Sequence, residues 1–222
     1  ATANATNIVS FTAGAGSSNS SGTVNLTTQT GGGTINMNAA SGDYKINGQG
    51  GVDSLTGGGG ADIINGGANA DNISGGNGDD VLSGGADNDS LTGGAGTDTF
   101  KVDVGTDTIT DLGGASGGET DVLIVSAGAT ANATNITSFT ADSSTSNSGT
   151  ANLTTKVGGG TIDIGNSTTG AYSLTGLSGN DTLKGNGNAD IINGGGGDDN
   201  IDGRGGNDEI NAGAGDDIIT VS

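Results

Sequence analysis

The sequence predicts an all-β chain that winds as a right-handed parallel β-roll, an elongated solenoid whose repeat blocks are separated by Thr-rich β spacer segments. A nine-residue phrase occurs six times from Gly48 to Lys101 and five times from Gly176 to Thr220. The sixth residue of every repeat is Asp, and the eighth is a large apolar residue. No 3.6-residue apolar periodicity is present, so helices are not expected. A nonapeptide of the form G-G-x-G-x-D-x-U-x, with U apolar, is the signature of this solenoid.

Both fixed positions hold in all eleven repeats. The sixth-position residues are Asp53, Asp62, Asp71, Asp80, Asp89, Asp98, Asp181, Asp190, Asp199, Asp208 and Asp217. The eighth-position residues are Leu55, Ile64, Ile73, Leu82, Leu91, Phe100, Leu183, Ile192, Ile201, Ile210 and Ile219. We expect two repeats to make one 18-residue coil. In each repeat the first six residues should form a turn and the last three an extended segment, with the eighth side chain pointing inward.

A larger repeat encloses the small one, because residues 1–11 return almost unchanged at 129–139 and define a unit of 128 residues. The chain therefore divides into five segments. They are a Thr/Ser/Gly-rich β spacer at 1–47, a first repeat block at 48–101, a capping coil at 102–128, a second spacer at 129–175 and a second repeat block at 176–222.

The first spacer alternates apolar and polar residues between Gly, Ser and Asn turns, which is typical of short strands. We expect these strands at Asn7–Phe11, Thr23–Thr27, Thr34–Met37 and Tyr44–Ile46. Both further coils of the solenoid and a small separately packed β unit fit the pattern, and the short strand lengths favour coils. The stretch at 102–128 keeps Asp107 and Ile109 in repeat register and is expected to close the first block.

Composition excludes several classes of protein. The 222 residues include 49 Gly, no Cys, His, Pro or Trp, and only 30% apolar residues, too few for an ordinary globular core. Without Cys and His, neither a zinc site nor a nucleophile–base pair is expected, so the chain is predicted not to be an enzyme. A net charge of −20 favours cations over nucleic acid as partners. No apolar run reaches the ~20 residues of a membrane helix, so membrane insertion is not expected.

The aspartates form ladders if residues 18 apart stack at the strand spacing of about 4.8 Å. The first block gives two ladders and the second block two more: Asp53, Asp71, Asp89 and Asp107; Asp62, Asp80 and Asp98; Asp181, Asp199 and Asp217; Asp190 and Asp208. Carboxylates stacked so closely repel one another unless a cation lies between them. Calcium suits such turns because it accepts six to eight oxygens in flexible geometry, whereas magnesium requires a rigid octahedron. One ion between neighbouring rungs gives about seven or eight calcium ions, depending on Asp107.

Glycine is expected in these turns because they need positive φ and a close approach of the backbone to the ion. Asn and Asp tolerate positive φ best after Gly, which fits Asn69, Asp87, Asn186 and Asn188 at Gly positions. Leu177 and Arg204 at second positions and Ala212 at a first position fit less well, and weaker ion binding is expected there. Asp79, Asp198 and Asp216 at fifth positions are expected to be solvated loop charges, with auxiliary metal ligation as the alternative.

These repeats resemble the repeats-in-toxin (RTX) family of secreted bacterial proteins. The resemblance implies calcium ligation by the sixth-position aspartates and by backbone carbonyls at positions one to four. Carried over to this chain, the carbonyl ligands would come from Gly66, Gly67, Gly75, Gly76, Gly78, Gly194, Gly195 and Gly197. It also implies type I secretion, directed by a signal at the far C-terminus of the parent protein. That signal is not found in these 222 residues, and we expect the chain to be a mature piece or a fragment.

Within that family, the tandem 128-residue unit looks most like a bacterial surface-layer (S-layer) protein or surface filament. The functional expectation is a secreted, extracellular structural protein that folds and self-associates in calcium, with a cell-surface polysaccharide as a further candidate partner. Repeats of this family also occur in adhesins and as stabilising modules of secreted toxins and enzymes, and both remain alternatives. Ice binding is not expected, because no rank of aligned Thr or Asn occupies the third and fifth positions.

Overall fold

A computed structural model describes residues 2–19, 23–113 and 120–220, and every regular element in these ranges is a β-strand. The chain divides into two compact units, Ala1–Thr108 and Ile109–Ser222. The strands of the first unit are β1 (Thr2–Ile8), β2 (Ser10–Thr12), β3 (Thr23–Thr28), β4 (Thr34–Asn36), β5 (Tyr44–Asn47), β6 (Ser54–Gly59), β7 (Ile63–Ala68), β8 (Asn72–Asn77), β9 (Val81–Ala86), β10 (Ser90–Ala95), β11 (Thr99–Val102) and β12 (Thr106–Ile109), the last of which ends one residue into the second unit.

The second unit contains the remaining strands. They are β13 (Val122–Val125), β14 (Thr130–Ile136), β15 (Ser138–Thr140), β16 (Ser146–Asn147), β17 (Thr150–Thr155), β18 (Thr161–Asp163), β19 (Tyr172–Thr175), β20 (Thr182–Lys184), β21 (Ile191–Gly196), β22 (Asn200–Asp202), β23 (Glu209–Ala214) and β24 (Ile218–Thr220). Within the described residues no helix is present that could cross a membrane.

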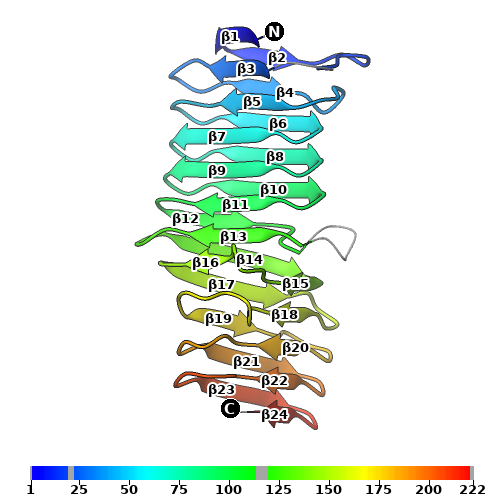
Figure 1. Cartoon of the computed structure of the whole chain (residues 1–222), viewed down its shortest axis with the longest axis vertical. Coiled ribbons are helices and arrows are strands. Elements are labelled where there is room, and N and C mark those ends of the chain that lie inside the picture. Colours follow the sequence, from blue (N-terminus) through cyan, green and yellow to red (C-terminus); the bar gives the residue numbers. More distant parts are fainter. Residues whose placement is uncertain (1, 20–22, 114–119, 221–222) are drawn as a thin grey trace. The chain divides into compact units, whose positions relative to one another are not determined.

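Strands pair with the next strand but one, which is the connectivity of a solenoid. In the first unit one sheet runs β1-β3-β5-β7-β9-β11 and the other runs β2-β4-β6-β8-β10. The strand pairings within both sheets are parallel, and Figure 1 shows the arrows of the two sheets pointing in opposite directions. In the second unit the two main rows are β14-β17-β19-β21-β23 and β15-β18-β20-β22-β24. The predicted parallel β-solenoid is therefore confirmed.

Coil length distinguishes the blocks from the spacers. In the blocks, paired residues are 18 apart, as for Ser90 and Asn72. In the spacers the coils are longer, with Thr34 paired to Ser54 and Ser138 to Thr161. The spacer strands pair directly with block strands, β4 with β6 and β18 with β20. The spacers are thus further coils of the same solenoid, as the sequence favours, with extra residues in their turns.

The core is a stack of the eighth-position side chains, whose exposed fractions are 0–1% from Leu55 to Phe100 and from Leu183 to Ile201. Ile210 is only partly buried and Ile219 is 50% exposed, because no coil of the described chain lies beyond them. Each repeat adds only one such side chain, so each coil adds two and the core is a narrow column. A column this thin buries little apolar area, and the turns must contribute the remaining stability.

Two local predictions are wrong. The extended segment is longer than three residues in much of the chain, because strands such as β6 and β21 continue through the first three positions of the next repeat. The turn in those repeats is therefore confined to positions four to six. The strand expected at Asn7–Phe11 is broken at Val9, where β1 ends and β2 begins, and Asn7 there has φ of 57°.

Candidate metal centre

The sixth-position aspartates stack as ladders held together by their own backbone. One carboxylate oxygen, Oδ1, accepts a hydrogen bond from the N–H of the aspartate 18 residues earlier. In the first block the acceptors are Asp71 (2.8 Å), Asp80 (2.7 Å), Asp89 (2.8 Å), Asp98 (2.9 Å) and Asp107 (3.0 Å). In the second block they are Asp199 (2.8 Å), Asp208 (2.9 Å) and Asp217 (2.9 Å). Asp107 therefore continues its ladder.

The second carboxylate oxygen, Oδ2, is the unusual feature of these ladders. It is buried without a hydrogen-bond partner in eight aspartates: Asp53, Asp62, Asp71, Asp80, Asp89, Asp107, Asp181 and Asp199. An unpaired buried carboxylate oxygen is costly, and buried charges in proteins are normally paired or bound to metal. A row of such oxygens is what a chain of cation sites requires.

Burial raises the pKa of these carboxyl groups. The pKa is raised from 3.8 to about 7 for Asp62, Asp71, Asp80 and Asp107, first by burial and further by neighbouring aspartates, while backbone N–H donors act in the opposite direction. The ladders in protein alone would therefore hold protons near neutral pH. A cation between neighbouring aspartates would supply the missing positive charge and favour the ionised form.

First-position glycines of the blocks lie beside the Oδ2 atoms of the aspartates in their own repeats. A Cβ built on Gly66 or Gly75 would lie closer than 3.0 Å both to the Oδ2 of the aspartate in the same repeat and to the carbonyl oxygen of the glycine 18 residues later. The same holds at Gly194, where the later carbonyl belongs to Ala212. Carboxylate and carbonyl oxygens thus converge where a side chain would stand, and these are the oxygen ligands that calcium prefers.

Most second- and fourth-position residues adopt positive φ, Leu177 being one exception, and this bends the turn around this space. Among the predicted backbone ligands, φ is 110° at Gly67, 122° at Gly76, 115° at Gly78, 101° at Gly195 and 125° at Gly197. The expectation that Asn and Asp replace Gly there is confirmed for Asn69 (75°) and Asp87 (81°). It is wrong for Asn186 and Asn188, which do not have positive φ.

No cluster of three or more carboxylate side chains that could hold a metal occurs in the part of the chain that the structure describes. The ladders bring aspartates together along a row rather than into a cluster. Backbone carbonyls would therefore complete most of a calcium shell, which fits the glycines found at most first and second positions of the repeat.

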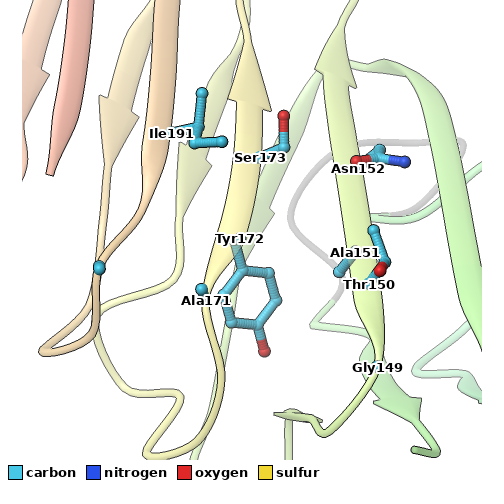
Figure 2. A pocket seen from close by; sticks show the side chains of 9 residues that line it. Gly149, Thr150, Ala151, Asn152, Ala171, Tyr172, Ser173 and Ile191 are labelled. Carbon is cyan, nitrogen blue, oxygen red and sulfur yellow. The ribbon is translucent and has the colours of Figure 1, made fainter. Parts of the chain in front are cut away.

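Sequence reasoning missed the residues that begin each ladder. The first aspartates accept hydrogen bonds from spacer backbone: Asp53 from Gly33 (2.6 Å), Asp62 from Tyr44 (2.7 Å), Asp181 from Gly160 (2.7 Å) and Asp190 from Tyr172 (2.8 Å). Tyr172 is one of the residues that line a hollow of about 310 Å³, together with Thr150–Asn152 and Ile191, and Figure 2 shows these side chains on their neighbouring strands. The equal places of Tyr44 and Tyr172 in the 128-residue unit are a signal that could have identified them.

An outer ladder of exposed side chains accompanies the buried one and was also missed. Oδ1 of Asp79 accepts the N–H of Thr97 (2.8 Å), and Oδ1 of Asp198 accepts the N–H of Asp216 (2.9 Å). In these bonds the side chain reaches toward the following coil, whereas the buried aspartates reach toward the preceding one. Asp79 and Asp198 are exposed, as expected, and their hydrogen bonds also link neighbouring turns.

Comparison with known proteins agrees with this geometry. The family model of the RTX calcium-binding nonapeptide repeat matches four times, at residues 47–82, 74–109, 167–201 and 193–221. These matches cover both repeat blocks and more than half of the chain. No curated protein and no solved structure matches the chain. The chain belongs to the family of RTX calcium-binding repeat proteins.

Proposed function

We propose that this chain is a secreted structural protein of a bacterial surface layer or filament, and that extracellular calcium switches on its folding and self-assembly. The observation that carries the proposal is the set of eight buried Oδ2 atoms without partners, repeated through two copies of one unit. A tandem unit built this way extends by repetition and needs calcium in every copy. No Cys or His is present in the sequence, and the carboxylate pairs are accounted for by metal, so catalysis is not part of the proposal.

Calcium would lie between neighbouring rungs of the ladders formed by Asp53, Asp71, Asp89 and Asp107, by Asp62, Asp80 and Asp98, and by Asp181, Asp199 and Asp217. The carboxylate Oδ2 atoms and the carbonyls of first-position residues such as Gly66, Gly75 and Gly194 converge beside these rungs. The resemblance adds the carbonyls at second and fourth positions.

The mechanism is linkage between calcium and folding. Calcium binds the folded chain and not the unfolded one, so each site contributes about 1–3 kcal/mol when calcium exceeds Kd tenfold to a hundredfold. Several such sites together provide the folding free energy that the small apolar core does not provide. At low calcium the chain stays unfolded and can be exported, and at roughly millimolar extracellular calcium it folds.

The test is a calcium titration of metal-stripped protein, followed by far-UV circular dichroism and sedimentation velocity together. A coil-to-β transition with growth of particles into sheets or filaments, seen by electron microscopy, supports the structural role. Folding that leaves a monomer would reject self-assembly and favour an adhesin or a stabilising module of a larger secreted protein. A chain already rich in β-structure without calcium would reject the linkage itself.

A further inference from the structure

Two turns occupy the same place in the two copies of the 128-residue unit but differ in structure. The turn at 57–62 carries Asp62, and the turn at 185–190 carries Asp190. In both, Oδ1 of the aspartate accepts the backbone N–H of a tyrosine, Tyr44 (2.7 Å) or Tyr172 (2.8 Å). The two turns therefore share the hydrogen bond to Oδ1, and they can be compared by the partner of the second carboxylate oxygen, Oδ2.

That second oxygen is free of protein partners in one turn and bonded in the other. Oδ2 of Asp62 is buried without a hydrogen-bond partner. Oδ2 of Asp190 accepts the backbone N–H of Asn186 at 2.8 Å. Both carboxylate oxygens of Asp190 thus accept hydrogen bonds from the protein, and the buried carboxylate needs no cation to compensate for its burial.

The backbone of the second turn has changed to make this bond. At positions two and four, Gly58 and Gly60 have φ of 129° and 118°, while Asn186 and Asn188 do not have positive φ. The Asn186 side chain fixes the new conformation, since its Oδ1 accepts the N–H of Asn188 (2.8 Å) and its Nδ2 donates to Gly170 (3.0 Å). Of the eleven repeats, all within the described residues, this is the one that lacks positive φ at both positions.

The positively charged side chain of Arg204 lies beside this turn. Arg204 replaces Gly76 of the first copy, and its Nη1 donates to the carbonyl of Gly185 at 3.3 Å. Gly185 holds the first position of the repeat that contains Asp190, the class of carbonyl that converges with Oδ2 elsewhere. The same guanidinium fills the space that a Cβ on Gly165 would occupy.

The guanidinium is held by a set of charges found in the second copy. Arg204 Nη2 lies 3.1 Å from Asp163 and Nε lies 3.8 Å from Asp202, while Lys184 Nζ lies 3.3 Å from Asp163. The first copy has neutral residues at all four places: Asn36, Thr56, Ser74 and Gly76. A partly buried arginine beside a carbonyl ligand repels a divalent ion at short range.

We propose that the site between Asp190 and Asp208 binds no calcium. Asn186 and Arg204 supply from the chain itself the hydrogen bond and the positive charge that calcium supplies at the equivalent site between Asp62 and Asp80. The turn that carries Asp190 then needs no calcium ion of its own, although the folded chain around it does. The chain binds one ion fewer than a count of its rungs gives. This inference rests on the proposed calcium sites and concerns where they stop.

The experiment is the calcium stoichiometry of the full chain at saturating calcium, by native mass spectrometry and by metal analysis after gel filtration. The double variant Asn186→Gly, Arg204→Gly restores the residues of the first copy and should bind one more calcium ion than the wild type. The control is Gln49→Gly. Gln49 is also at position two with positive φ (64° against 59° for Arg204), and its N–H likewise donates to the side chain two residues earlier, so its replacement tests backbone relief alone. The control should gain no ion.

A second pair of variants keeps the test decisive if the double variant does not fold. Asp62→Asn should lose one calcium ion, and Asp190→Asn should lose none. An ion lost from Asp190→Asn, or no ion gained by a folded double variant, overturns the inference. If Asp62→Asn and Asp71→Asn also leave the stoichiometry unchanged, the ladder sites of the proposed function fail instead.

Discussion

The two repeat blocks solve the same electrostatic problem differently. In the first block, five sixth-position aspartates from Asp53 to Asp89, and Asp107 beyond the block, leave Oδ2 buried and unpaired. In the second block, Asp181 and Asp199 do so, Asp190 is satisfied by backbone, and Arg204 and Lys184 form ion pairs with Asp163. On the proposed function, the first block would depend on external cations at most of its aspartates, whereas the second carries part of its positive charge in its own side chains.

The difference teaches that a regular repeat does not imply equal sites. Both blocks present the same fixed aspartate and the same buried apolar column, yet replacing two glycines, at positions 58 and 76 of the first copy, changes the ligand environment of one rung. We therefore expect the blocks to separate in their response to calcium, protons and substitution.

Calcium removal should have the largest effect. As the calcium concentration is lowered, the first block should unfold at a higher concentration than the second. Loss of about 1–3 kcal/mol per site, over several sites, is expected to unfold the chain at neutral pH. Tyr44 and Tyr172 are the two tyrosines, one beside each block, and there is no Trp. Fluorescence of Tyr172→Phe therefore follows the first block and that of Tyr44→Phe the second. The comparison fails if the second block unfolds at the higher calcium concentration.

Acid should partly replace calcium. The carboxyl pKa of Asp62, Asp71, Asp80 and Asp107 is about 7 in the folded, metal-free chain, against an ordinary value of 3.8. The folded state then binds more protons than the unfolded state, so its stability falls as pH rises from about 4 to 7. Circular dichroism of stripped protein should show more β-structure at pH 4.5 than at pH 7.5. In calcium, protons compete with the ion, and affinity should fall as pH drops below about 7.

Neutralising matched aspartates should separate the blocks by ion count. Asp80→Asn removes a carboxylate that borders two proposed calcium sites of the first block. We expect the loss of one or two ions. At about 1–3 kcal/mol per site, this lowers the stability in millimolar calcium by about 1–6 kcal/mol. Its equivalent, Asp208→Asn, should leave the ion count unchanged. Titration calorimetry on both variants measures the difference, and equal ion losses would remove the distinction between the blocks.

Filling the space at a first-position glycine should weaken calcium binding in one block alone. A Cβ on Gly75 would clash with Asp80 Oδ2, so Gly75→Ala should lower calcium affinity at that rung about tenfold or more, roughly 1.4 kcal/mol. Gly203→Ala would crowd Asp208 in the same way and should lower stability without changing calcium affinity. Gly59→Ala is the control, since its nearest atom would lie 3.4 Å away.

The smallest effect is expected at the exposed outer ladder. Asp79→Asn removes a charge but keeps an oxygen that can accept the N–H of Thr97. Its stability should change by less than about 0.5 kcal/mol, and its ion count should stay the same, as for most surface substitutions. A lost ion would instead make Asp79 an auxiliary calcium ligand in the first block.

Much of the fold could be predicted from the sequence because the repeat enforces it. A nine-residue period with one fixed apolar position leaves few ways to bury that position, and stacking every 18 residues brings Asp53, Asp71 and Asp89 into one row. The strand break at Val9 and the longer spacer coils were harder, because no fixed period runs through the spacers.

The sequence by itself determined the parallel coils, the aspartate ladders and the calcium-binding family. Only the tertiary structure decided which partner each second carboxylate oxygen finds. Asn186 at a glycine position could have kept the positive φ of Gly58, and nothing local fixes Arg204 to a carboxylate 41 residues away. Those outcomes depend on atoms that the solenoid brings together from different coils. The repeated residues determine the structure that all coils share. The effect of a residue that departs from the repeat, such as Asn186 or Arg204, depends on its contacts with other coils.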